Sequence, residues 1–283
     1  MSKRIAIVGT RGAGKSVFIT VLAKHLSQPR NGVQLVADSL GTAEYIELNY
    51  AALQRSEWIP STNTEQALGW SFRSPGNDPQ ELTLLDFQGE VFQELFARRN
   101  FEEDSLGEKD TELVDYLISA SSVIVLINLQ DFLDTSFEED SVSGKLHREH
   151  ALIEFLSTLK QDSNKHIAIV FTAYDQFQTR IKEEYKNVKV FLKKELPTFF
   201  CKHIEGSRTP GFLVSAVAET IKGSNGSVPK PGSKHAGLDK VISWMVDPAA
   251  YIENFNKSKQ AKNVREQQEG QDKNVDSPKW TEW

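Results

Sequence analysis

The stretch that decides the fold is Gly9-Thr10-Arg11-Gly12-Ala13-Gly14-Lys15-Ser16. An apolar run, residues 5–8, precedes it, and a helix-forming run, residues 17–26, follows it. The order strand, glycine-rich loop, helix, with the spacing G-x-x-x-x-G-K-S, is typical of a phosphate-binding P-loop. The glycines let backbone N–H groups approach a polyphosphate, and the helix N-terminus adds partial positive charge there. The sequence therefore predicts that the chain binds a nucleotide.

Each position of this loop has an expected role. Lys15 can reach the β- and γ-phosphates, and the Ser16 hydroxyl can ligate Mg²⁺. Arg11 either leans over the phosphates as a charge stabiliser or faces solvent. The predicted nucleotide-binding set in this part of the chain is Gly9, Arg11, Gly12, Ala13, Gly14, Lys15, Ser16 and Val17.

Length and composition limit what else the chain can be. Its 283 residues allow one large domain or two small ones, and 39% hydrophobic residues suffice for a core. A net charge of −6 argues against direct binding of nucleic acid. The single cysteine, Cys201, excludes an intrachain disulfide and fits a reducing compartment. With no apolar run near the ~18 residues of a membrane span and no signal peptide, we expect a cytoplasmic protein without a transmembrane segment.

The rest of the chain alternates strands with helices. A helix over 41–53 precedes two strands, 64–73 and 82–86, which read as an antiparallel hairpin. Continuous apolar runs at 122–127 and 167–171 predict buried parallel strands, and 211–215 a last short one. We expect helices at 147–159, 179–196 and 238–246, and a loop at 222–237.

This pattern predicts an α/β fold, a P-loop three-layer sandwich with a mostly parallel sheet and one antiparallel edge strand. The expected domain covers residues 1–248, and residues 249–283 form a polar tail that is partly disordered or helical.

A second motif, Asp86-Phe87-Gln88-Gly89, ends the apolar strand at 82–86. An aspartate at the carboxyl end of such a strand lies where ligands bind in open α/β sheets. Asp86 can hold Mg²⁺ together with Ser16, directly or through water. Gly89 leaves room for its N–H to approach a γ-phosphate.

These motifs give the chain a specific resemblance. A hairpin followed by Asp86-x-x-Gly89 resembles the third motif of GTPases of the Ras and translation-factor class. The stretch from Thr172 to Asp175 resembles their base-reading [N/T]-K-x-D motif, and Ser215-Ala216-Val217 resembles their S-A-K motif. The P-loop and the segment 58–62 also look like the bacterial double-GTPase group, found in multi-gene conflict or effector systems.

The resemblance implies further site residues and partners. A threonine of the first switch loop should ligate Mg²⁺; Thr64 and Thr62 both fit, and Thr64 is preferred because it adjoins the strand. Thr172, Asp175, Ser215, Ala216 and Val217 should surround a guanine base. GTP or GDP with Mg²⁺ is the implied ligand, and a protein effector or activating partner is the implied binding partner.

Three departures from the family pattern affect these expectations. Glu90 stands where relatives carry the glutamine that orients the attacking water, with Gln88 as a nearby alternative, so hydrolysis should be slow or partner-dependent. Ala173 replaces the lysine that packs along the base, although Asp175 can still accept two hydrogen bonds from guanine. Val217 replaces the lysine of the last motif.

The leading hypothesis is a Mg²⁺-dependent GTP-binding switch with slow or partner-stimulated hydrolysis, assisted by Lys15, Gln88 and Glu90. Two alternatives remain open: a nucleotide-bound scaffold that does not hydrolyse, which Glu90 favours, and an ATPase that uses the same loop.

Overall fold

The amino-terminal strand and helix form on either side of the glycine-rich loop. In the computed structural model, β1 (Arg4–Gly9) is buried from Ile5 onward and leads into α1 (Lys15–His25). The structure describes residues 4–9, 12–60, 67–85, 115–129, 149–150, 152–157, 159, 165–205, 209–217, 219–223 and 226–254.

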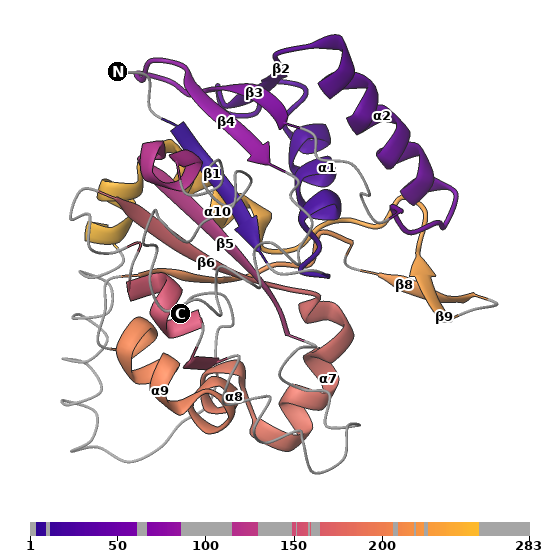
Figure 1. Ribbon diagram of the computed structural model, residues 1–283. Coiled ribbons are helices and arrows are strands. Elements are labelled where there is room, and N and C mark those ends of the chain that lie inside the picture. Colours follow the sequence, from indigo (N-terminus) through magenta and orange to yellow (C-terminus); the bar gives the residue numbers. More distant parts are fainter. Residues whose placement is uncertain are drawn as a thin grey trace, which may run out of the picture.

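Seven strands form one sheet in the order β2-β3-β4-β1-β5-β6-β7 (Figure 1). The strands other than β1 are β2 (Gln34–Ala37), β3 (Ala67–Arg73), β4 (Gln80–Leu85), β5 (Ser122–Asn128), β6 (His166–Thr172) and β7 (Gly211–Leu213). The five strands β4, β1, β5, β6 and β7 run parallel to one another, whereas β3 runs antiparallel to both β2 and β4.

The predicted α/β fold with a mostly parallel sheet and a β3–β4 hairpin is confirmed. The antiparallel pairing lies at one side of the sheet, where β3 is flanked by β4 and by the edge strand β2. The edge strand is β2, because its backbone pairs with the open side of β3, with Leu35 opposite Phe72.

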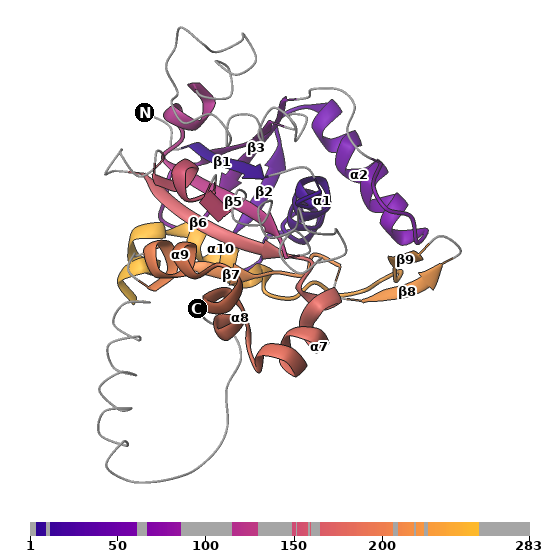
Figure 2. The same ribbon diagram turned by 60° about the horizontal axis from the view of Figure 1, so that its bottom comes forward.

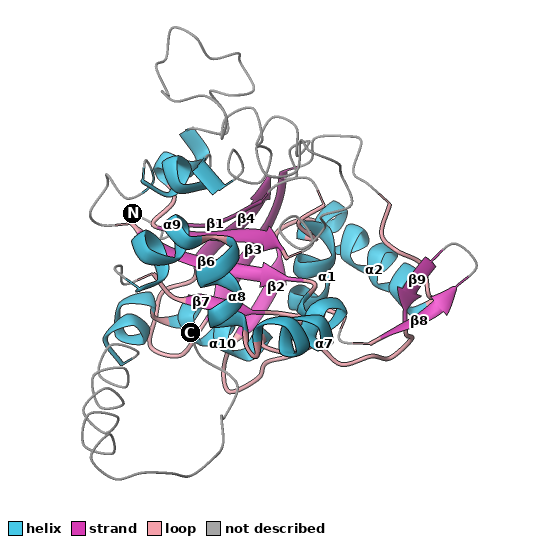
Figure 3. Cartoon of the chain, turned by 90° about the horizontal axis from the view of Figure 1, so that it is seen from below, coloured by secondary structure: helices cyan, strands magenta, loops and turns pink. Residues whose placement is uncertain are grey.

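Helices cover both faces of the sheet, because successive side chains of a strand point to opposite faces. On one face, Ile124 and Leu126 of β5 pack in the same core as Phe18 of α1 and Trp244 of α10 (Leu238–Val246). Val123, Val125 and Ile127 face a second core with side chains of α7 (Tyr174–Tyr185) and α8 (Val188–Glu195). Figure 3 shows the strands between these helical layers.

The charged stretch predicted as one helix over 179–196 is two helices. Lys186 has a φ of 67°, in the left-handed region, which ends α7. The Asn187 side chain then accepts a hydrogen bond from the backbone N–H of Val190 and caps α8. Two short helical segments follow, α9 (Pro197–Phe199) and the π-helix η2 (Phe200–Glu205).

The predicted loop at 222–237 contains a β-hairpin. Its strands are β8 (Thr220–Gly223) and β9 (Gly226–Pro229), which pair apart from the main sheet. The hairpin lies beside the carboxyl end of α2 (Leu40–Gln54), as Figures 1 and 2 show. Trp58 Nε1 donates to the carbonyl of Ser227 at 2.7 Å, which ties the segment after α2 to this hairpin.

The chain stays packed on the sheet beyond α10. Residues 248–254 are helical, and the Tyr251 ring lies 5.6 Å from that of Phe212 in β7. The predicted domain boundary at 248 stays a prediction, and residues 255–283 of the predicted tail lie outside the described residues. Within the described part of the chain, no helix is both long enough and apolar enough to pass through a lipid bilayer.

Candidate functional site

The predicted site residues gather at the carboxyl edge of the sheet. Gly9, Asn128 and Thr172 are the last residues of β1, β5 and β6, three adjacent parallel strands. Ser215 follows β7 at the same edge. This is the edge at which open α/β sheets bind their ligands.

The glycine-rich loop presents an open backbone surface. Gly12 and Gly14 have φ angles of 75° and 77°, and a Cβ atom built on either would meet nothing within 4 Å. Gly14 is the N-cap of α1, and no side chain accepts a hydrogen bond at this cap. The first N–H groups of the helix are therefore not capped by a side chain, which is the arrangement that suits an anion.

Gly9 is required by packing rather than by its backbone angles. A Cβ atom at this position would lie 2.7 Å from the carbonyl oxygen of Leu126 and 3.1 Å from Cβ of Ala13. The loop can therefore fold back close to β5 only because residue 9 has no side chain.

Lys15 reaches across the loop. Its ammonium group donates to the carbonyl oxygen of Gly9 at 3.0 Å, so the charge lies over the loop that the two later glycines leave open. Ser16 and Val17 follow in the first turn of α1 and are half-buried.

Two side chains from neighbouring strands fix the loop. The hydroxyl of Thr172, which is buried, donates to the carbonyl of Ala13 at 2.9 Å and also lies 3.3 Å from that of Ile127. Asn128 Nδ2 donates to the carbonyl of Gly12 at 3.0 Å. The sequence analysis did not identify Asn128 as a site residue; the signal that could have found it is a polar residue at the end of an apolar strand. In this structure the hydroxyl of Thr172 positions the loop, and its predicted contact with a base stays a prediction.

Asp175 and Ser215 come together although 40 residues separate them. The backbone N–H of Asp175 donates to the buried Ser215 hydroxyl at 2.9 Å. Burial raises the pKa of the Asp175 carboxyl, and hydrogen bonds from Ser215 and from backbone N–H groups act in the opposite direction. Ala173, with a φ of 57°, is the left-handed N-cap of α7 and turns the chain between the strand and this carboxylate.

A backbone pair anchors the loop that holds Ser215. Its N–H donates to the carbonyl of Ala236 at 3.1 Å, and the N–H of Ala236 donates back at 2.9 Å. Ala216 and Val217 continue from this anchor, and both line a pocket beside α1. Of the three residues of the predicted S-A-K-like motif, Ser215 contacts Asp175, whereas Ala216 and Val217 line a pocket that Asp175 does not reach.

The sequence model of the family described as Double-GTPase 1 matches residues 6–209, most of the chain. This chain belongs to the Double-GTPase 1 family. The predicted resemblance to P-loop GTPases, and to their double-GTPase group, is therefore confirmed. Membership supports the binding of a guanine nucleotide by a switch-type protein.

Solved structures similar to this Double-GTPase 1 chain share little sequence with it. The G domain of the T. maritima FeoB iron transporter is 14% identical with a TM-score of 0.40, covering 87% of this chain and 98% of that one. A variant of Aquifex aeolicus Era bound to GDP·AlF₄⁻ is 15% identical with a TM-score of 0.38, covering 87% and 56%. The S. cerevisiae Ski7 GTPase-like domain bound to GTP is 12% identical with a TM-score of 0.39, covering 87% and 50%. Among curated proteins, no sequence matches this chain.

Several predicted site residues of this Double-GTPase 1 domain lie outside the described residues: Arg11, Thr62, Thr64, Asp86, Gln88, Gly89 and Glu90. Their predicted roles stay predictions. Asp86 directly follows β4, which runs parallel to β1 and so ends at the edge where Gly9 lies. Within the described residues, no group of three or more His, Cys, Asp or Glu side chains is arranged to hold a metal ion.

Proposed function

We propose that this Double-GTPase 1 domain binds GTP with Mg²⁺ and hydrolyses the γ-phosphate slowly, and that the bound nucleotide controls contacts with a protein partner. The observation that carries the proposal is the common edge shared by the open glycine loop and the Asp175–Ser215 pair. The glycine loop suits phosphates, and the Asp175–Ser215 pair suits the polar groups of a base.

The phosphate end is built from the loop and Lys15. The open backbone at Gly12 and Gly14 and the start of α1 accept negative charge without a side chain in the way. Lys15, which contacts the Gly9 carbonyl in this structure, would turn its ammonium group to the β- and γ-phosphates.

The base end depends on Asp175. A carboxylate accepts two hydrogen bonds, and guanine offers two donors on one edge whereas adenine does not. The bond from Asp175 N–H to Ser215 fixes the loop from which this carboxylate projects. This arrangement favours GTP over ATP. An ATPase that uses the same loop remains the alternative.

The residues available fit Mg²⁺. Ser16 stands in the first turn of α1 beside the open glycine cradle, and hydroxyl and carboxylate oxygens are the ligands that Mg²⁺ prefers. Ser16, Asp86 and Thr64 would hold the ion, with Thr62 as the alternative to Thr64. When bound, Mg²⁺ neutralises charge that develops on the phosphates.

Slow hydrolysis follows from Glu90 in the place of a water-orienting glutamine. Its carboxylate can position water but repels the γ-phosphate, and Gln88 is an alternative. The same residue favours the second candidate function, a nucleotide-bound scaffold that never turns over.

Calorimetry with the full chain and Mg²⁺ tests nucleotide and base choice. We expect GTP to bind about 10- to 100-fold more tightly than ATP, because a charged hydrogen bond contributes about 1.5–3 kcal/mol. Asp175→Ala should abolish this preference, and Lys15→Ala should weaken both nucleotides. The matched control is Glu183→Ala, which removes an exposed carboxylate from the same helix, α7. Equal affinities of the wild-type protein for GTP and ATP would contradict the guanine assignment.

Single-turnover hydrolysis separates the switch from the scaffold. Slow phosphate release from bound GTP, lost on removal of Mg²⁺, supports the switch. GTP that stays intact on the protein, with and without added cell extract, supports the scaffold.

A further inference from the structure

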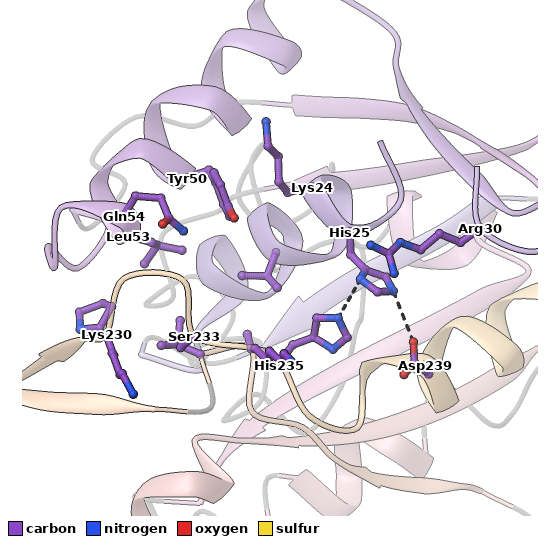
Figure 4. Close-up of a pocket in the computed structure, with 15 residues that line it drawn as sticks. Lys24, His25, Arg30, Tyr50, Leu53, Gln54, Lys230, Ser233, His235 and Asp239 are labelled. Atoms are coloured by element: carbon purple, nitrogen blue, oxygen red, sulfur yellow. Dashed lines mark hydrogen bonds and ion pairs between the residues drawn. The ribbon is translucent and has the colours of Figure 1, made fainter. Parts of the chain in front are cut away.

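A pocket lies beside the proposed base-binding loop, Ser215 to Val217, and apart from the glycine-rich loop. Its volume is about 560 Å³, within the roughly 300–1,000 Å³ of small-molecule sites. Its walls come from the second half of α1, the end of α2, Arg30, the pair Ala216 and Val217, and the stretch from Pro229 to Asp239 (Figure 4). Neither Lys15 nor Asp175 lines it, so this pocket adjoins the proposed nucleotide site and shares with it only Ala216 and Val217.

The walls carry an excess of positive charge on an acidic chain. Four lysine and arginine side chains and one carboxylate, Asp239, line the pocket, whereas the chain as a whole has a net charge of −6. Lys24 and Lys230 pair with Glu47 and Glu219, which do not line the pocket.

The other two cations, Arg30 and Lys234, form no ion pair with any residue in the described part of the chain. Two uncompensated cations at one recess favour an anionic ligand, and arginine and lysine both bind phosphoryl groups.

Two histidines add a further polar group on the same wall. His25 Nε2 lies 3.3 Å from an oxygen of Asp239, and His25 Nδ1 lies 2.7 Å from His235 Nε2 (Figure 4). With Asp239 accepting from His25, His235 must donate to His25, so its own Nδ1 is left as an acceptor. That Nδ1 is buried and has no hydrogen-bond partner among the described residues.

The environment of these two imidazoles disfavours their protonated forms. Burial lowers the pKa of His25, with further lowering from His235 and Arg30; burial likewise lowers the pKa of His235, and Arg30 adds to it. Asp239 opposes both shifts. An anion beside Arg30 would offset the arginine charge and allow His235 to take up a proton, which would convert the unpartnered Nδ1 into a donor.

A short connection leads from this pocket to the proposed base-binding loop. His235 precedes Ala236, whose backbone forms two hydrogen bonds with Ser215, and Ser215 in turn accepts from the N–H of Asp175. Ala216 and Val217 belong to the pocket wall itself. A ligand that shifts the segment around His235 therefore acts on the loop that places Asp175.

We propose that this pocket binds a small phosphorylated molecule through Arg30, Lys234 and the His25–His235 pair, and that the bound molecule changes nucleotide affinity through the Ser215–Ala236 pair. The second part rests on the proposed function, and the first does not. A recess of this size favours a small ligand over an acidic peptide.

The binding test uses inorganic pyrophosphate as the probe, titrated into the full chain at constant ionic strength and followed by calorimetry. Pyrophosphate can also bind the glycine loop, so the titration is repeated with Lys15→Ala. We expect the Lys15→Ala protein to retain binding, and the added substitutions Arg30→Gln and Lys234→Gln to weaken it at least tenfold.

The matched control is Lys222→Gln, which removes an exposed lysine of β8 that does not line the pocket. Binding that is lost with Lys15→Ala but unaffected by Arg30→Gln and Lys234→Gln would assign pyrophosphate to the glycine loop and overturn the proposal. An equal loss of pyrophosphate binding with the Lys222→Gln control would show that the binding is general charge attraction, and this would also overturn the proposal. Inorganic phosphate in a parallel titration shows whether one phosphoryl group is enough.

The coupling test measures the dissociation rate of a fluorescent GDP analogue with and without pyrophosphate. A change of threefold or more that disappears with Arg30→Gln and Lys234→Gln supports coupling, and an unchanged rate refutes it. If the protein binds no guanine nucleotide, the proposed function fails, while pyrophosphate binding to the Lys15→Ala protein still decides the pocket.

Discussion

Replacing Gly237 by alanine tests how tightly the loop of Ser215, Ala216 and Val217, the proposed base-binding loop, is held. Gly237 has a φ of 79°, and a Cβ atom there would lie 2.0 Å from the carbonyl oxygen of Leu213. The obstacle is backbone at the end of β7, so it cannot rotate away. We expect the alanine to push the segment that contains Ala236 away from the sheet and to weaken its two hydrogen bonds with Ser215.

Gly232 provides the matched control within the same segment. Its φ is 69°, but a Cβ atom there meets nothing within 4 Å. Gly232→Ala should therefore cost only the left-handed backbone strain, about 1 kcal/mol. Gly237→Ala should add the cost of forcing atoms into a packed site, about 1–3 kcal/mol, for a total of about 2–4 kcal/mol.

Urea denaturation followed by tryptophan fluorescence measures this difference, because the adjacent helix α10 contains the buried Trp244. The two variants should differ in the urea concentration at the midpoint of unfolding, whereas the dependence of the unfolding free energy on urea concentration should stay the same. Gly237→Ala should also weaken GTP binding more than Gly232→Ala does, because only the former disturbs the Ser215 anchor. Equal losses of stability in the two variants would refute the reasoning, as would a loss for Gly237→Ala below 1 kcal/mol.

Three further predictions concern single contacts. Thr172→Val leaves the buried carbonyl of Ala13 without its hydrogen-bond donor, which should cost about 1–3 kcal/mol of stability and weaken nucleotide binding. Thr172→Ser keeps the hydroxyl and should keep both the stability and the binding. Urea denaturation measures the stability and calorimetry the binding. Asn187→Ala removes the cap of α8 and should cost about 1 kcal/mol, with Asn187→Asp as the control that keeps an acceptor; an unchanged midpoint contradicts it. Because burial lowers the pKa of His25 and His235, the unfolded state binds more protons below the ordinary value near 6.5, so the unfolding free energy should fall as pH drops from about 7 through that value. Replacing both histidines by asparagine should flatten this slope, and an unchanged slope would exclude them as its source.

The strands and the loop were predictable because they depend on local patterns. The apolar runs at 122–127 and 167–171 became β5 and β6, and the glycine spacing correctly indicated the strand–loop–helix unit. The hairpin β8–β9 was not predictable, because its strands are short, rich in glycine and proline, and paired only with each other. The break at Lys186 was missed because a charged stretch of helical composition does not reveal a left-handed residue.

The sequence by itself determined the chemistry that we propose for this protein: a glycine loop with Lys15 and Ser16 for phosphates, and Asp175 as the carboxylate for a base. Short-range spacing suffices for this, since neighbouring residues share one local backbone. Only the tertiary structure decided what holds these groups in place. Thr172 and Asn128 reach the loop from other strands, and Gly237 lets Ala236 anchor Ser215, because strand order brings together residues that lie far apart in the chain. The same long-range packing forms the basic pocket around His25 and His235, and no local pattern in the sequence predicts this pocket.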